Sequence, residues 1–478
     1  MPASRRYSFF VATCLAALAA VAFAVLFAAC QRAPGAQGKQ DGVERQTSGA
    51  EREAPDATTS EPDANASRTV PGVGAPAFAG RIAFASVDGA IRSVLPDGKD
   101  PIVVASPDPG SAGGRFGGAY TWPVWSPDGS ALLLSRVVEE DGRRLQASLV
   151  KASASGNETP SLIYRDDPGS FGIGTGVPHY AVWSPDSSRV ALIAGGGSGL
   201  MTIFVDPSLR LAPDAFVGGE AMFLAWSADS RHLLVHHGDS LRLVEFDEQG
   251  GRSGGSQGVG GGSFDYLAPQ FEPAGDRFVY VEAEGGRSLV KLGWVGEAET
   301  RALAESAGQI AFRLSPDGRM VAFLEGEDQR VFQRLVVVDT ATGDRNVLLS
   351  RPMHSFWWSP DGTKIAVASL ADGGLDALAW SVVDLATRQE IDLGVNVPTA
   401  EFQFMQTFFD QYAHSHAIWS PDSRAIVVFG AMPGSPGDGQ DADTDAPDPG
   451  AYAWVLDATG HRPPARVGAG YIGAWSPR

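Results

Sequence analysis

A five-residue pattern, Trp-Ser-Pro-Asp-Gly, constrains this chain more than any other feature. It occurs eight times with variation, and the copies begin at Trp125, Trp183, Trp226, Phe271, Leu314, Trp358, Trp419 and Trp475. The spacings between these anchor residues are 58, 43, 45, 43, 44, 61 and 56 residues. Self-similarity at a nearly fixed period is the signature of a fold built from one repeated structural unit.

Each copy predicts a turn between two strands. Pro sets the φ that a type I turn needs at its second position, Asp suits the third position, and Gly suits the fourth. A short apolar run follows each turn, such as Ile-Ala-Val-Ala at 365–368, and such runs are typical of buried strands. Further runs at 335–339 and 345–349 complete four strands per unit, and four strands at a period of about 40–50 residues are typical of a β-propeller blade.

The two ends of the repeat region indicate how the fold closes. The first strand-like segment, 81–85, has no turn before it, and the last turn, at Trp475, has no strands after it. The C-terminal strand would therefore supply the innermost strand of the blade that begins near Gly80, which removes free sheet edges. We predict an all-β fold, a β-propeller of eight four-stranded blades closed by the C-terminal strand joining the N-terminal blade.

The N-terminus predicts export and membrane attachment. Arg5 and Arg6 precede an apolar run from Phe9 to Ala29, and small residues stand directly before Cys30. This pattern is similar to a bacterial lipoprotein signal, so we expect a signal peptide over 1–30 with lipidation at Cys30. An uncleaved signal anchor is the alternative, because 21 apolar residues can span a bilayer. Residues 31–76 lack aromatic residues and predict a disordered tether, which leaves 77–478 as the propeller.

Charge and cysteine content exclude several functions. The formal net charge is −19, which argues against a nucleic-acid partner. The only cysteines are Cys14 and Cys30, so the propeller can hold no disulfide, no cysteine zinc site and no thiol nucleophile. We expect no cofactor, and we expect the partner to be a protein or small ligand outside the cell membrane, with the membrane itself contacted through the lipid anchor.

The Trp-Ser-Pro-Asp-Gly turns and their spacing resemble the TolB-like, WD-like propeller repeats, over roughly residues 80–478. These repeats occur in the periplasmic TolB protein and in the propellers of prolyl-oligopeptidase-type enzymes. The resemblance implies a propeller with an interaction or gating role. In the peptidases a separate α/β-hydrolase domain carries the chemistry, and we expect none here because only three residues follow Trp475.

The residues just before each innermost strand should line one mouth of the central channel. Histidines, aromatics and acids gather at these positions, and they make the following candidate ligand-binding set: His179, Tyr180, Asp265, Tyr266, His354, Trp357, Asp410, Tyr412, His414 and His416. Such a concave site with a few convergent polar groups suits a small ligand or a peptide. The same residues can equally be ordinary polar side chains on a loop-rich face.

A metal site is a further alternative. His354 lies one blade from His414 and His416, so these three side chains could converge with Asp410 as an oxygen ligand. His179 lies four blades from His354 and should not reach the same ion.

The insertion 399–415 carries aromatic residues at helical spacing and predicts a short amphipathic helix that either caps the channel mouth or simply packs on the propeller. The fold and the N-terminus together predict an extracytoplasmic, membrane-tethered binding or scaffold module. The alternative function is that of an enzyme, for example a metal-assisted hydrolase or lyase that uses the His/Asp-lined mouth.

Overall fold

A computed structural model describes most of the chain after residue 77. The described residues are 78–107, 118–140, 143–166, 173, 177–196, 199–210, 214–217, 222–238, 240–261, 267–273, 275–326, 331–371, 376–434 and 450–478. They belong to one compact unit, Ala77–Arg478. The predicted signal segment, Cys30 and the tether lie outside them. No helix in these ranges is both long and apolar enough to cross a bilayer.

Four separate antiparallel sheets contain four strands each. The first consists of β4 (Ala119–Trp125), β5 (Ala131–Glu140), β6 (Arg143–Ser153) and β7 (Ser161–Arg165). The second consists of β8 (His179–Trp183), β9 (Val190–Gly196), β10 (Gly199–Val205) and β11 (Asp214–Val217). The third consists of β12 (Met222–Trp226), β13 (His232–His237), β14 (Ser240–Glu245) and β15 (Gln257–Gly261). The fourth consists of β16 (Gln270–Phe271), β17 (Arg277–Glu284), β18 (Arg287–Trp294) and β19 (Arg301–Ser306).

The remaining strands pair in one continuous order of thirteen. In that order they are β20 (Gln309–Leu314), β21 (Met320–Gly326), β22 (Phe332–Asp339), β23 (Arg345–Trp358), β24 (Lys364–Leu370), β25 (Leu378–Asp384), β26 (Glu390–Pro398), β27 (Ala425–Ala431), β28 (Tyr452–Asp457), β29 (Ala465–Trp475), β1 (Ile82–Ser86), β2 (Ile91–Val94) and β3 (Ile102–Ala105). The C-terminal strand β29 pairs antiparallel with β1, and Trp475 lies opposite Ile82. The first and last strands of the unit are therefore joined, as the turn pattern predicts.

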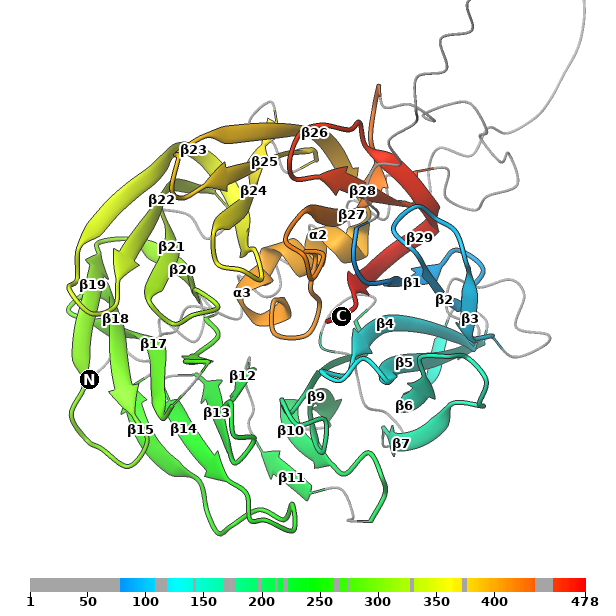
Figure 1. Cartoon of the computed structure of the whole chain (residues 1–478). Helices are drawn as coiled ribbons and strands as arrows, with labels where there is room; N and C mark the ends of the chain where they lie inside the picture. The colour runs from blue at the N-terminus through cyan, green and yellow to red at the C-terminus, as the bar shows by residue number, and fades with distance from the viewer. Residues whose placement is uncertain are drawn as a thin grey trace, which may run out of the picture. The chain divides into compact units, whose positions relative to one another are not determined.

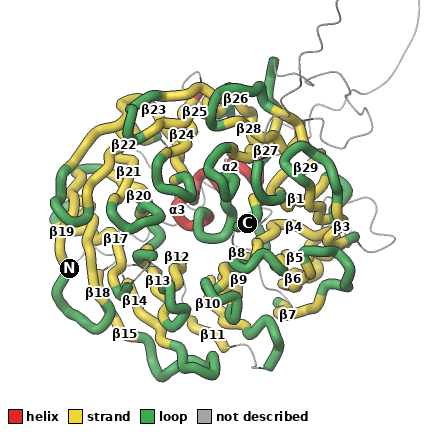
Figure 2. The backbone as a smooth tube through the Cα atoms, in the orientation of Figure 1, coloured by secondary structure: helices red, strands yellow, loops and turns green. Residues whose placement is uncertain are grey.

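Two short helices, α2 (Ala400–Thr407) and α3 (Phe409–Tyr412), lie among the sheets. Figure 1 shows the sheets arranged around them, with the inner strands β4, β12 and β20 facing the helices. The tube in Figure 2 shows the same relation, with the helices at the centre and the strands around them. The helices contact β20, β23, β26, β27 and β29. The centre of the fold is thus occupied by the segment that sequence analysis singled out as an insertion.

The repeated turns have the geometry that their residues predict. In each complete Ser-containing copy the fifth residue donates its backbone N–H to the serine carbonyl, as Gly362 does to Ser359 at 2.9 Å. This fifth residue has a left-handed φ, +69° at Gly362, which favours glycine. Where serine replaces glycine, as at Ser423 with φ +57°, its Oγ accepts the backbone N–H of Asp361 in the neighbouring turn at 3.1 Å. The strained serine therefore contributes a bond between adjacent repeats.

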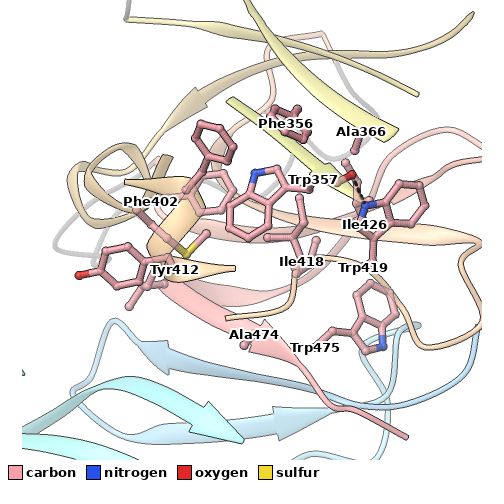
Figure 3. Packing of buried hydrophobic residues seen from close by; sticks show 14 of the residues in the cluster. Phe356, Trp357, Ala366, Phe402, Tyr412, Ile418, Trp419, Ile426, Ala474 and Trp475 are labelled. Carbon is pink, nitrogen blue, oxygen red and sulfur yellow. Dashed lines mark hydrogen bonds between the residues drawn. The ribbon is translucent and has the colours of Figure 1, made fainter. Parts of the chain in front are cut away.

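Indole groups of the anchor residues tie neighbouring inner strands together. Trp125 donates to the carbonyl of Ala474 at 3.2 Å, and Trp183 donates to that of Val124 at 3.3 Å. Trp419 repeats the contact by donating to the carbonyl of Trp357 at 3.0 Å (Figure 3). At these positions tryptophan fills a buried site and also donates a hydrogen bond to the neighbouring inner strand. Trp226 differs, because its buried Nε1 has no hydrogen-bond partner.

This difference gives a matched pair of variants. Trp419→Phe removes a donor from the carbonyl of Trp357, so we expect the free energy of unfolding to fall by about 2–3 kcal/mol, from the lost bond together with lost packing. Trp226→Phe removes a donor that is buried without a partner, and we expect it to cost less than half as much. Urea unfolding of both variants measures the difference; equal losses would show that the indole bonds do not stabilise the repeat contacts.

Candidate functional site

Local sequence explains why the insertion forms helices. Thr399 is the N-cap of α2: its Oγ1 accepts the N–H of Phe402 at 3.3 Å, which satisfies one of the free donors of the first turn. Glu401 adds an acidic side chain to that turn, where the helix dipole favours negative charge. The helix breaks at Phe408, whose φ of −119° and ψ of 39° are not helical, and α3 starts at the next residue. Neither helix contains glycine or proline.

One side of this segment, called the central plug (residues 400–412) below, is packed as core. Phe402, Met405, Phe409 and Tyr412 are each at most 2% exposed. Phe402 packs with its ring centroid 5.6 Å from that of Phe429, and Phe409 lies 5.1 Å from Phe356. Figure 3 shows Phe402 and Tyr412 beside Trp357 and Ile418 in the same cluster. The helical prediction is correct, and the aromatic face of the insertion packs on the surrounding strands.

Polar groups of the inner strands also bond to the central plug. Gln411 accepts twice, because its backbone carbonyl takes the hydroxyl of Tyr180 at 2.9 Å and its Oε1 takes the N–H of Leu224 at 3.2 Å. Gln406 Oε1 accepts from Ser355 Oγ at 2.6 Å and from Trp357 Nε1 at 3.0 Å. These contacts come from three different sheets, so one short segment bonds to strands far apart in the sequence.

Asp410 makes the most buried charged contact of the plug. Its Oδ2 accepts the N–H of Ala268 at 2.7 Å, and its backbone carbonyl accepts from Arg313 Nη1 at 2.9 Å. Burial raises the pKa of Asp410 to about 6, against the opposing effects of the Ala268 bond and the Arg313 charge. Burial likewise lowers the pKa of Arg313 to about 10. The pair holds α3 against β20 and the segment before β16.

The structure brings most of the predicted site residues together, but as packing partners of the plug. Tyr180 and Trp357 bond to it as described, and His354 Nε2 lies 3.2 Å from Gln403 Nε2. The rings of Tyr412 and His416 lie 5.5 Å apart. Burial lowers the pKa of His416 to about 3, and it lowers the pKa of His414 well below its usual value. Asp265 and Tyr266 lie outside the described residues.

His179 does not join this group. Its Nε2 lies 2.9 Å from Asp166 Oδ1 and its Nδ1 lies 3.2 Å from Ser135 Oγ, and all three residues are buried. The ring of Tyr164 packs edge-on against the histidine at 5.9 Å. These residues come from β5, β8 and the end of β7, so they connect two neighbouring sheets. The residues before an inner strand therefore do not all point to the centre.

The geometry around the plug is not that of a metal centre. Among the described residues, no group of three or more His, Cys, Asp or Glu side chains is placed to hold an ion. His354 lies against Gln403, while His416 packs its ring 5.5 Å from Trp122. The predicted convergence of His354, His414 and His416 as ligands is thus not seen in these residues.

Several central residues lie outside the candidate ligand-binding set. Trp122 is 2% exposed, and its ring centroid lies 5.2 Å from that of Tyr412. Its φ of +52° is left-handed, and it lies where the register of β4 against β5 shifts. Bulky residues rarely adopt this conformation, so the strand is strained to place the indole against the plug. Arg313, Gln406 and Gln411 were also missed. Arg313 directly precedes the anchor Leu314, so the rule that selected the other inner-strand residues would have found it.

Comparisons with known proteins identify the fold and no family. No protein-family model matches the chain, and a comparison with curated proteins finds no match. A prolyl endopeptidase structure matches 75% of this chain at 12% identity, with a TM-score of 0.50, and this chain spans 50% of that protein. TolB from Acinetobacter baumannii matches 73% of this chain and 84% of its own at 13% identity and TM-score 0.35. An oligogalacturonate lyase from Vibrio parahaemolyticus matches 60% of this chain and 76% of its own at 11% identity and TM-score 0.42.

The prolyl endopeptidase structure shares the fold of 75% of this chain, and this likeness leaves the activity open. Propellers host unrelated functions, so any functional conclusion must come from this chain's own residues.

Proposed function

We propose that this protein is an extracytoplasmic, eight-bladed propeller, tethered to a bacterial membrane through Cys30, that works by binding a partner. Eight sets of four strands result when β23 and β29 are each divided between two sets. The bridge between Trp419 and Ile426 then supplies the inner strand of the set that contains β27 and β28. The TolB-like turns and the lipoprotein-type segment support the location.

A binding function is supported by one observation: the polar side chains predicted to line the channel mouth already hydrogen-bond to the plug or belong to it. Tyr180, Trp357 and Asp410 each use their polar atoms in bonds to or from residues of this chain. A catalytic acid, base or metal ligand must instead reach a substrate in a productive geometry. An enzyme at this place is therefore the weaker alternative.

The surface that remains for a partner at this centre is the outer side of the plug. Phe404 and Phe408 are half-buried there and pack with ring centroids 5.1 Å apart, with Gln403 and Thr407 half-buried beside them. Aromatic side chains within a polar surround are favoured anchors in protein interfaces. We place the binding surface on this face of the plug.

The test is affinity capture from the native membrane fraction with the full chain as bait, beside the variant Phe404→Ser. We expect a stoichiometric protein on the wild-type bait and at least tenfold less on the variant, with both baits fully folded at the temperature of the capture. The control variant is Leu209→Ser, which changes a side chain that is 55% exposed between β10 and β11. Equal capture by wild type and Phe404→Ser would contradict this surface, and turnover lost on His354→Ala at unchanged stability would favour the enzyme.

A further inference from the structure

We propose that a second ligand site, independent of the central plug, lies between the β8–β11 and β12–β15 sheets and takes a small carboxylate with an apolar body. A cavity of about 260 Å³ opens there, and its lining includes Arg189, Phe204, Val205, Arg210, Phe246 and Arg252. Its walls come from three parts of the chain: Ser188 and Arg189 after the Trp183 turn, Asp206 and Arg210 after β10, and residues 248–252 between β14 and β15.

Aromatic residues supply the apolar part of the cavity. Phe204 is 7% exposed and Phe246 is 1% exposed, and their rings meet edge-to-face at 5.1 Å. Trp226 supports Phe246 from behind, with the ring centroids 5.0 Å apart. Ligand sites combine such an apolar lining with a few placed polar groups. A flat or aliphatic ligand body would lie over the narrow exposed edge of Phe204, with the buried Val205 and Phe246 forming the wall beneath it.

Arg189 holds the two sheets together at this point. Its Nη1 donates to the carbonyl of Ser230 at 2.8 Å and its Nη2 donates to that of Asp247 at 3.0 Å, with the guanidinium 5.4 Å from the Phe246 ring centre. Lys364 reaches the carbonyl of Ser423 in the same way elsewhere in the repeat. Arg189 is therefore a structural tie whose hydrogen bonds go to neutral carbonyls, and its positive charge remains in the wall of the cavity.

Arg210 provides the donors for a carboxylate, because its two terminal nitrogens have no hydrogen-bond partner among the described residues. Its Nε donates to Ser208 Oγ at 2.8 Å and lies 3.6 Å from Asp206 Oδ2, while the side chain is 80% exposed. Asp206 Oδ2 already accepts the backbone N–H of Arg210, and its Oδ1 accepts that of Ser208. The N–H groups on the two terminal nitrogens of Arg210 can therefore donate two parallel hydrogen bonds to the two oxygens of a carboxylate.

Charge balance limits the ligand to one carboxylate. Arg252 is engaged by Asp214, with Nε 2.7 Å from Oδ2, and Asp206 lies beside Arg210. Arg189 donates its hydrogen bonds to two carbonyls, its charge acts on the nearby Asp186, and Glu248 is exposed at the rim. A multiply charged anion would meet these acids, whereas a monocarboxylate would contact the arginines and leave its apolar part on the phenylalanines.

Isothermal titration of the full chain with 3-phenylpropanoate tests the site, with 3-phenylpropanamide and inorganic phosphate as separate probes. We expect saturable binding of the carboxylate, at least tenfold weaker binding of the neutral amide, which lacks the charge, and at least tenfold weaker binding of phosphate, which lacks the apolar body. Binding of the amide or of phosphate as tight as that of the carboxylate would overturn the proposal, as would the absence of saturable carboxylate binding.

Arg210→Gln locates the binding, and its exposure makes the fold insensitive to the change. We expect it to weaken binding of 3-phenylpropanoate at least tenfold. The matched control is Arg319→Gln, which also removes an exposed arginine, 84% exposed, beside an aspartate at 3.8 Å, in another repeat. Its affinity should equal that of the wild type. Equal loss in both variants, or no loss in Arg210→Gln, would overturn the site.

Discussion

Phe409→Ala is expected to lower the free energy of unfolding by about 3–5 kcal/mol, the range for removal of a fully buried phenylalanine side chain. Phe409 is 1% exposed and packs against Phe356 from the centre of the fold. The loss follows because the surrounding inner strands cannot collapse onto the vacated volume without breaking their own pairing. Denaturant unfolding of the full chain, followed by tryptophan fluorescence, measures the change.

The neighbouring residue provides the control. Phe408 is half-buried on the outer side of the plug, so Phe408→Ala removes less buried area, and we expect a loss of about 1 kcal/mol. The two variants remove the same side chain at adjacent positions, so the difference between them reports burial alone. Similar small losses in both would mean that the plug is a loosely attached loop and that the centre is open.

Acidification is expected to destabilise the fold through His414 and His416, the two histidines that follow the plug. The pKa of His416 is about 3 in the folded chain and 6.5 as the reference value, because burial opposes its charge. An unfolded chain binds this proton near pH 6.5 and the folded chain does not, so the stability is complete above that pH and is lost as the pH falls towards 3. Between about pH 6.5 and 4.5 the loss from His416 amounts to about 2 kcal/mol, and His414 shifts in the same direction.

Asp410 acts with the opposite sign. Its folded pKa of about 6 lies above the reference value of 3.8, so its contribution is complete below 3.8 and is lost as the pH rises through 6. The stability lost through His414 and His416 on acidification exceeds the stability gained through Asp410. The free energy of unfolding of the wild type should therefore fall as the pH is lowered from 6.5.

Two variants separate these contributions in urea titrations at several pH values. His416→Phe keeps a ring against Trp122 and removes the titrating group, so the dependence on pH should flatten. Asp410→Asn keeps an acceptor for the Ala268 N–H and removes the carboxyl group that gains stability at low pH. The free energy of unfolding of this variant should therefore fall more steeply with falling pH than that of the wild type. A pH profile unchanged in both variants would mean that these side chains are hydrated in the folded protein.

The repeat could be predicted because each turn is specified by adjacent residues. Ser359, Pro360, Asp361 and Gly362 carry the turn geometry in their own backbone preferences, and the apolar runs beside them give the strands. The pairing of β29 with β1 followed from counting turns against strands. Hydrogen bonds between distant parts of the chain could not be predicted in this way. Nothing in the sequence around Gln411 indicates that its carbonyl accepts from the hydroxyl of Tyr180, 231 residues earlier.

In the candidate site, too, local structure could be predicted from the sequence but long-range contacts could not. Aromatic spacing at 399–415 was sufficient to predict a helix, because helix periodicity is local. Whether that helix caps a channel or fills its centre depends on the space left by strands from the whole chain, and the positions of Leu224, Ala268 and Arg313 decide it. His179 was grouped with the mouth on position alone, whereas its partner Asp166 lies at the end of a different sheet.

Hydrogen exchange of the full chain, read by mass spectrometry, tests most directly whether the plug is part of the core. Several plug amides donate hydrogen bonds within the described structure, including Gln403 to Thr399 at 2.8 Å and Tyr412 to Phe408 at 3.0 Å. If the plug is core, peptides covering 402–412 should exchange as slowly as those of β24, whose strand is buried and paired on both sides. Exchange of these peptides within seconds, as for an exposed loop, would contradict it.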